Sequence, residues 1–162
     1  MSDKTFRGNA SQFFVAGELC RRGYPAVVTL GNCPNTDIFC SNRDATRFAH
    51  IQVKTFVPGN GTCTVGMKAE KDFGCNFFWV LAGIPTVNQQ AAHEYYIIPS
   101  KVMSKNIIEG HKIWIETPGK KGQKHNPSNV RAVHLPPRVS LNGWDISKYL
   151  NRWDIIEKVL NS

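Results

Sequence analysis

A continuous apolar run, Phe77 to Ala82, places the strongest constraint on the fold of this chain. A strand that is apolar at every position is typical of the inside of a sheet that is covered on both faces. Helices can supply that cover at Ser11 to Arg22 and at about Lys101 to Glu109, and an amphipathic segment closes the chain from Ser147 to Leu160. The expected architecture is therefore a mixed α/β sandwich around one sheet.

Four further strands are expected beside this run, and they are Tyr24–Leu30, Thr36–Ser41, Phe48–Val57 and Glu94–Ile98. A turn that starts at Asn42 joins the second of these to the third, so the two form a hairpin. The chain has no internal repeat or low-complexity tract, and 162 residues are close to the usual size of one domain. Residues 1–162 are therefore expected to form a single α/β domain.

The chain has a positive net charge of +8 in an otherwise ordinary globular composition. A basic balance fits an acidic partner, of which nucleic acid is the commonest, and it equally fits a generally basic surface. The five cysteines are odd in number and lack metal-finger spacing, which indicates free thiols in a reducing compartment. The N-terminus is polar, and no apolar run approaches the ~18 residues of a membrane span. We expect a cytoplasmic protein that does not enter a membrane.

Three polar residues of the hairpin form the strongest candidate for a chemical site. Alternation along a strand puts Gln52 and Lys54 on one face, and Asp37 lies fifteen positions before Gln52 in the partner strand. A hairpin of that length can bring Asp37 beside both. A carboxylate and an amide oxygen suit Mg²⁺ or Mn²⁺, and a lysine next to them can orient a water or neutralise a developing oxyanion.

The helix before the hairpin adds to this pattern. At 100° per residue, Gln12, Val15, Ala16, Leu19 and Cys20 share one face, which is the face expected to point inward. Glu18 falls outside it, so we expect this carboxylate to be solvated or paired with Arg22. The same helix ends in Arg21-Arg22-Gly23-Tyr24, directly before the first strand.

Over about the first 55 residues, this helix followed by Asp37 and Ile51-Gln52-Val53-Lys54-Thr55 resembles the PD-(D/E)XK nuclease-like proteins in their Q-x-K variant. That family includes Holliday-junction resolvases, many restriction enzymes and some homing endonucleases. The resemblance implies a restriction-endonuclease-like fold, with a mixed central sheet flanked by helices. It also implies that Asp37, Gln52 and the Val53 carbonyl hold Mg²⁺ or Mn²⁺, and that Lys54 acts on the water or the transition state.

One position departs from the family pattern. Members with this helix usually carry a Glu in the turn before Val15-Ala16, where the present chain has Gln12. Gln12 is thus expected to complete the catalytic group without adding charge. A site with Asp37 as its one carboxylate binds a dication more weakly than sites with two or three, because each lost charge removes Coulomb attraction.

Basic residues late in the chain are candidates for phosphate contact. Lys120, Lys121 and Lys124 lie in a Gly-rich loop, and Arg131 follows it. The alternative is that this loop only connects two elements and is exposed to solvent. His125, Arg131 and His134 could reach the site or serve structural roles, whereas packing roles are expected for His111 and Trp114.

These observations leave three hypotheses for function. The first is a Mg²⁺-dependent endonuclease that hydrolyses DNA phosphodiester bonds, favoured by the trio of Asp37, Gln52 and Lys54. The second is a catalytically weak or inactive protein of the same fold that binds nucleic acid or a protein partner, favoured by the low carboxylate count. The third treats the trio as coincidence in an α/β protein of other function. Many members of the family act as dimers, which makes a homodimer a further expectation.

Overall fold

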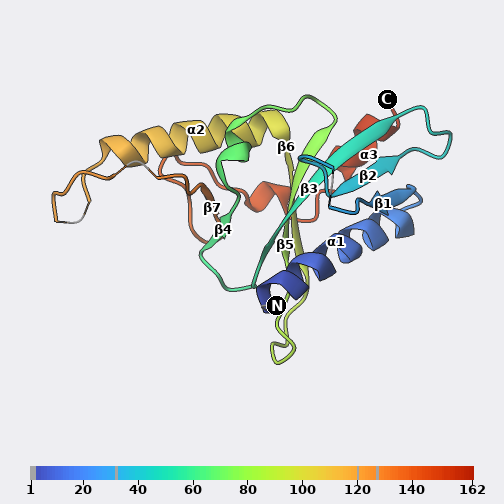
Figure 1. Cartoon of the computed structure of the whole chain (residues 1–162), viewed down its shortest axis with the longest axis horizontal. Helices are drawn as coiled ribbons and strands as arrows, with labels where there is room; N and C mark the ends of the chain where they lie inside the picture. The colour runs from blue at the N-terminus through green and yellow to red at the C-terminus, as the bar shows by residue number, and fades with distance from the viewer. Residues whose placement is uncertain (1–2, 32, 120, 127) are drawn as a thin grey trace.

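The apolar run forms strand β5 (Phe77–Gly83), and every residue of this strand is buried. It pairs in parallel with β3 (Phe48–Phe56) and antiparallel with β6 (Glu94–Pro99). Strands β2 (Ile38–Ser41) and β1 (Ala26–Val28) complete the order β1-β2-β3-β5-β6, each antiparallel to its neighbour (Figure 1). The structure is a computed structural model that describes residues 3–31, 33–119, 121–126 and 128–162. The expected mixed sheet with this run as an inner strand is confirmed.

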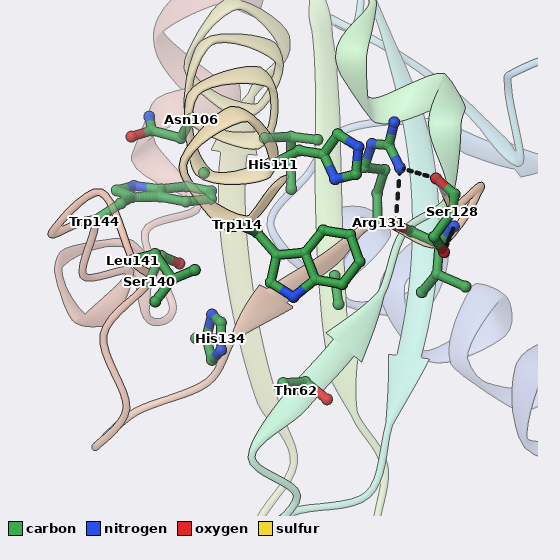
Figure 2. A pocket seen from close by; sticks show the side chains of 14 residues that line it. Thr62, Asn106, His111, Trp114, Ser128, Arg131, His134, Ser140, Leu141 and Trp144 are labelled. Carbon is green, nitrogen blue, oxygen red and sulfur yellow. Dashed lines mark hydrogen bonds between the residues drawn. The ribbon is translucent and has the colours of Figure 1, made fainter. Parts of the chain in front are cut away.

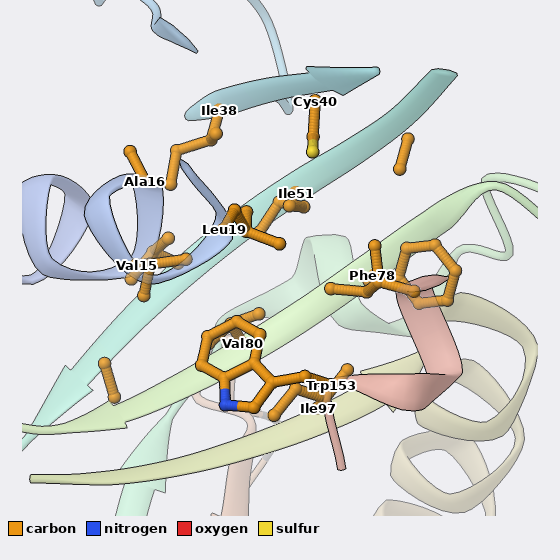
Figure 3. Packing of buried hydrophobic residues seen from close by; sticks show 14 of the residues in the cluster. Val15, Ala16, Leu19, Ile38, Cys40, Ile51, Phe78, Val80, Ile97 and Trp153 are labelled. Carbon is orange, nitrogen blue, oxygen red and sulfur yellow. The ribbon is translucent and has the colours of Figure 1, made fainter. Parts of the chain in front are cut away.

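The first and last helices cover one face of this sheet. They are α1 (Asp3–Arg21) and α3 (Asp154–Leu160), which come from the two ends of the chain. Their apolar sides meet the sheet in one buried cluster that includes Val15, Leu19, Ile51, Val80 and Trp153 (Figure 3). Burial of such side chains stabilises the fold by roughly 1.5–3 kcal/mol each, before the entropy cost of ordering them.

The other face is covered by α2 (Ser100–Glu116) and by a small two-stranded sheet of β4 (Thr62–Thr64) and β7 (Ala132–His134). Two short 3₁₀ helices, η1 (Met67–Glu70) and η2 (Ser147–Tyr149), lie against the same side. The second buried cluster contains residues from all of these regions, among them Phe56, Trp79, Leu81, Met103, Val133 and Ile146. Figure 1 shows α2 with β4 and β7 extending away from the end of the sheet that carries β1.

Several element boundaries differ from the expectation. Helix α1 begins at Asp3, not near Ser11, and α2 runs through Gly110 to Glu116. The closing segment is not one helix: η2 and α3 are separated by Asn151, whose φ of 53° is incompatible with a continuous right-handed helix. The strands of the small sheet were not expected, because three residues are too few to show a period. In the described residues, no helix is long and apolar enough to cross a membrane.

Candidate active site

The start of β2 brings Asp37 against the middle of β3. The backbone N–H of Asp37 donates to the carbonyl of Ile51 at 2.9 Å. The carboxylate of Asp37 lies over the same strand, where Oδ2 accepts a hydrogen bond from Nε2 of Gln52 and another from the backbone N–H of Val53 at 2.7 Å. The hairpin thus joins two side chains that the sequence proposed as metal ligands.

Lys54 continues this group along β3. Ile51 and Val53 belong to the core beneath α1, so alternation places Gln52 and Lys54 on the opposite face of the strand. Gln52 is buried and lies beside Trp79 of β5 in the strand register, whereas Lys54 is only half-buried. The polar group therefore has an apolar neighbour on one side and an accessible cation on the other.

Burial raises the pKa of the Asp37 carboxyl above its ordinary value. The hydrogen bond from Val53 and the positive charge of Lys54 act in the opposite direction on this pKa. The Gln52 amide and the charge of Lys68, in η1, also favour the ionised form. Lys68 could not be predicted from the sequence, because η1 was not expected. The charged carboxylate keeps a desolvation cost that a bound cation would relieve.

Three oxygen atoms at this edge suit a hard divalent cation. Among the described residues, both hydrogen bonds to the Asp37 carboxylate end on Oδ2, which leaves Oδ1, and the Gln52 amide donates through Nε2, which leaves Oε1. The N–H of Val53 points toward Asp37, and the C=O of a strand residue points to the same edge as its N–H. Carboxylate, amide and carbonyl oxygens are the ligands that Mg²⁺ prefers, so the donor set fits this ion.

The charge of this donor set is low. Among the residues that the structure describes, no group of three or more His, Cys, Asp or Glu is placed to hold a metal ion. A cation at this edge would therefore meet Asp37 as its one carboxylate, with two neutral oxygens from Gln52 and Val53. This arrangement favours a labile cation that keeps several water ligands over a tightly held one.

Helix α1 is hydrogen-bonded to β3 through Ser11. Ser11 is fully buried, and its Oγ lies 2.6 Å from Oγ1 of Thr55, whereas Gln12 is half-buried. The inward line is therefore Ser11, Val15 and Leu19, and the expectation that Cys20 also points inward is wrong, because Cys20 is exposed. The predicted part of Gln12 in the catalytic group stays a prediction.

The helix also contains a carboxylate outside the site, Glu18. Its side chain binds the guanidinium groups of Arg21 and Arg22, each at 2.8 Å. The expectation that Glu18 pairs with Arg22 is confirmed. Arg22 also reaches Glu157 of α3 at 3.0 Å, so these charges link the two helices that cover this face.

The predicted phosphate-binding residues fall into different surroundings. Lys121 and Lys124 are exposed in the loop after α2, and Lys120 lies outside the described residues. Arg131 is buried, and its guanidinium donates to Glu70 and to the carbonyls of Ser128 and Val130. This placement gives Arg131 a structural role in joining η1 to β7, and its predicted contact with phosphate stays a prediction.

A cavity of about 430 Å³ separates α2 from β7 and the segment that follows it (Figure 2). His111, His134 and Trp144 line it together with Trp114, which stacks on His111 with ring centroids 5.5 Å apart. His125 stacks on the same indole at 4.1 Å. His125, Arg131 and His134 are thus gathered around this cavity, and the residues that line it do not include Asp37 or Lys54.

A second hollow, of about 560 Å³, opens directly beside Lys54. It lies between the first turns of α1 and the chain that leads from β3 into β4. Lys4 and Arg7 of α1 line it, and neither was considered from the sequence, because the helix was expected to start after them. The earlier start of α1 therefore adds two cations to the neighbourhood of the polar group.

Comparison with known proteins bears on the fold. No protein-family model and no curated protein sequence matches this chain. Among solved structures, that of a bacterial homing endonuclease, I-Ssp6803I, is similar. The match has a TM-score of 0.57 at 15% identity and covers 99% of this chain and 96% of the other. The chain has a nuclease-like fold. At this level of identity the likeness concerns the fold alone.

Proposed function

We propose that this chain is a metal-dependent endonuclease of the PD-(D/E)XK type, in its Q-x-K variant, that hydrolyses phosphodiester bonds of DNA. The observation that carries the proposal is the contact of the Asp37 carboxylate with Gln52 and Val53, on the strand face that also presents Lys54. A nuclease-like fold similar to that of a homing endonuclease supports it, as does the net charge of +8.

In this proposal Asp37, Gln52 and the Val53 carbonyl would hold Mg²⁺ or Mn²⁺. Held there, such an ion would supply charge stabilisation at the scissile phosphate and would lower the pKa of a water. Lys54, half-buried on the same strand face, stabilises negative charge as it builds on the phosphate or orients the attacking water. The exposed Lys121 and Lys124 would contact the DNA backbone at a distance from the chemistry.

The second candidate function is a protein of the same fold that binds nucleic acid or a protein partner and cuts weakly or not at all. The observation that favours it is the single carboxylate among the oxygens at the site, with Ser11 and the half-buried Gln12 where α1 approaches β3. A cytoplasmic location and a homodimer stay predictions under either function.

The two candidates can be separated with supercoiled plasmid and branched DNA, incubated with the protein in Mg²⁺, in Mn²⁺ and in EDTA. Under the proposed function, the wild type cuts at least one substrate in a metal-dependent way. The nearly isosteric change Asp37→Asn and the change Lys54→Met each lower the rate by about 10²-fold or more, because each removes a group that acts on the reacting phosphate.

Lys158→Met is the matched control for the lysine change. Lys158 is exposed on α3, which covers the opposite face of the sheet, so the variant loses the same charge far from the proposed site. Its rate should stay within about twofold of the wild type. Cutting that persists in both Asp37→Asn and Lys54→Met would rule out this active site. DNA binding without any cutting would establish the second function.

A further inference from the structure

The hollow beside Lys54 is strongly basic. Lys4 and Arg7 come from α1, Lys54 comes from β3, and the polar side chains of Asn60 and Thr64 add to its wall. No Asp or Glu is found among the described side chains that line it. Figure 1 shows the start of α1 beside the end of β3, where the hollow lies.

The thiol in the wall of the hollow, that of Cys63, adds no negative charge. Cys63 of β4 also lines the hollow, and burial raises the pKa of its thiol to about 12, although Lys54 acts to lower it. At neutral pH the thiol is protonated. The described lining of the hollow therefore supplies three cations, and the charge of one of them, Lys54, also acts on the pKa of Asp37.

Arg7 carries an unused donor in this wall. Its Nε is buried, and in the described part of the chain it has no hydrogen-bond partner. A buried donor without a partner costs on the order of 1–3 kcal/mol, and native structures rarely leave one without a reason. This Nε is out of contact with solvent, so an oxyanion in the hollow would supply the missing acceptor, and a charge of the right sign, once the Arg7 side chain turns toward it.

Gly8 keeps the hollow open on the side of the helix. A Cβ built on Gly8 would meet no atom within 4 Å, although the residue sits in the second turn of a packed helix. Its backbone is fixed nonetheless, because its carbonyl accepts a hydrogen bond from the buried Ser11 at 2.7 Å. The part of the hollow next to Gly8 is thus bounded by the hydrogen-bonded backbone of α1 and by the cations of the wall.

We infer that this hollow binds a phosphate of the DNA backbone next to the phosphodiester that is cleaved, with Arg7 as the residue that positions it. The ligand chemistry is a phosphoryl oxyanion, and the assignment to DNA rests on the proposed function. Val53 and Lys54 belong both to the wall of the hollow and to the proposed active site. A phosphate held by Arg7 would therefore be the neighbour, along the DNA strand, of the phosphate that reacts.

Two glycines of α1 provide a matched test. Gly8 and Gly17 both have open space around the position of a Cβ, and both lie in α1 at ordinary helical geometry. They are separated by about half a turn around the helix and roughly 13 Å along it. Gly8→Glu places a negative charge in the hollow, whereas Gly17→Glu adds the same charge outside it.

The measurement is the affinity for a fluorescent DNA duplex in EDTA, over a series of salt concentrations. Gly8→Glu should weaken binding by about 10-fold or more relative to Gly17→Glu, because it sets a like charge against the phosphate. Arg7→Gln should weaken binding and reduce the slope of log K against log salt by about 1, the value for one lost phosphate contact. Arg7→Lys should restore the slope but only part of the affinity, because lysine keeps the positive charge but cannot form the bidentate hydrogen bonds of a guanidinium.

Thermal unfolding of each variant is measured in parallel, so that loss of fold is not counted as loss of binding. The inference is overturned if Arg7→Gln and Gly8→Glu bind DNA as Gly17→Glu does. It is also overturned if Arg7→Gln leaves the affinity for DNA unchanged while inorganic phosphate raises the melting temperature of the wild type but not of Arg7→Gln. The hollow would then bind free phosphate and not DNA. DNA binding is measured without metal, so the inference about the hollow can be confirmed even if the protein is found not to cut DNA.

Discussion

At the scale of single residues, Asp37 shows opposing demands of folding and chemistry. Its carboxylate is placed where burial disfavours its charge, and hydrogen bonds from Gln52 and Val53 only partly compensate. Groups with such a conflict are common at functional sites, where the surrounding fold maintains them. The conflict can be measured without any substrate.

Asp37→Asn should stabilise the protein at pH 7 in EDTA, because the amide removes the cost of a buried charge while its oxygen can still accept both hydrogen bonds. The pKa of Asp37 is raised in the folded state, so the cost is fully present above that pKa and is relieved as the pH falls toward the ordinary value of 3.8. Urea unfolding of both proteins between pH 7 and pH 4 should show the advantage of the variant shrinking with falling pH. An advantage that grows toward pH 4 would contradict this assignment.

The residues of the site differed in how far the sequence could reveal them. Gln52 and Lys54 follow from the period of two along a strand, and Asp37 follows from the length of the hairpin. Arg7 and Lys68 depend instead on where α1 and η1 begin and on how these elements pack against β3. No local pattern carries that information, because packing across the fold decides it.

At the scale of elements, the seam between α1 and β3 depends on one buried pair of hydroxyl groups. Ser11 donates its single proton to the carbonyl of Gly8, so Thr55 is the donor in the 2.6 Å contact between the two hydroxyls. This bond fixes the middle of α1 beside the strand that carries Lys54. The helix therefore has a polar anchor near its middle and an apolar face, with Val15 and Leu19, in its second half.

Ser11→Ala should lower the free energy of unfolding by about 1–3 kcal/mol, because it leaves the hydroxyl of Thr55 without its partner. Thr55→Val should cost a similar amount. The double variant should cost clearly less than the sum, because it removes both polar groups together. Urea unfolding of the four proteins gives the coupling energy, and additive effects would show that the two hydroxyls do not act as a pair.

The elements that the sequence missed share a physical reason. β4 and β7 have three residues each, and both are held by pairing with a distant segment, as in the register Cys63 to Val133. Tertiary pairing outweighed the weak local signal of these two strands, whereas the long strands β3 and β5 could be predicted from their own residues. The C-terminal end of α2 differs, because the helix continues through Gly110 to Glu116 although its buried side chains end at Ile107 and a glycine there costs about 1 kcal/mol.

At the scale of the whole molecule, the two ends of the chain close the same face of the sheet. Ile156 and Leu160 of α3 are fully buried in the cluster that also holds Val15 and Leu19 of α1. The neighbouring ion pair of Arg22 with Glu157, at 3.0 Å, is partly exposed. Apolar packing, and not this ion pair, is therefore expected to hold the C-terminal helix in place.

Two neighbouring positions of α3 test this expectation. Ile156→Ala should lower the free energy of unfolding by about 2–5 kcal/mol, because it opens a cavity in a close-packed cluster. Glu157→Gln should change it by less than about 1 kcal/mol, because the ion pair is screened by solvent. Equal effects in thermal or urea unfolding would mean that charge contributes as much as packing at this junction.

The proposed function depends on a divalent-cation site at the edge of β3 next to Asp37, on a nuclease-like fold. The most direct measurement is an anomalous difference map from crystals of the wild type soaked in Mn²⁺, with crystals of Asp37→Asn as the control. A cation held at this edge should give a peak in contact with Asp37, Gln52 and the Val53 carbonyl, and this peak should be absent from the variant. A peak elsewhere with Asp37 uninvolved, or no peak at this edge at any Mn²⁺ concentration that the crystals tolerate, would contradict it.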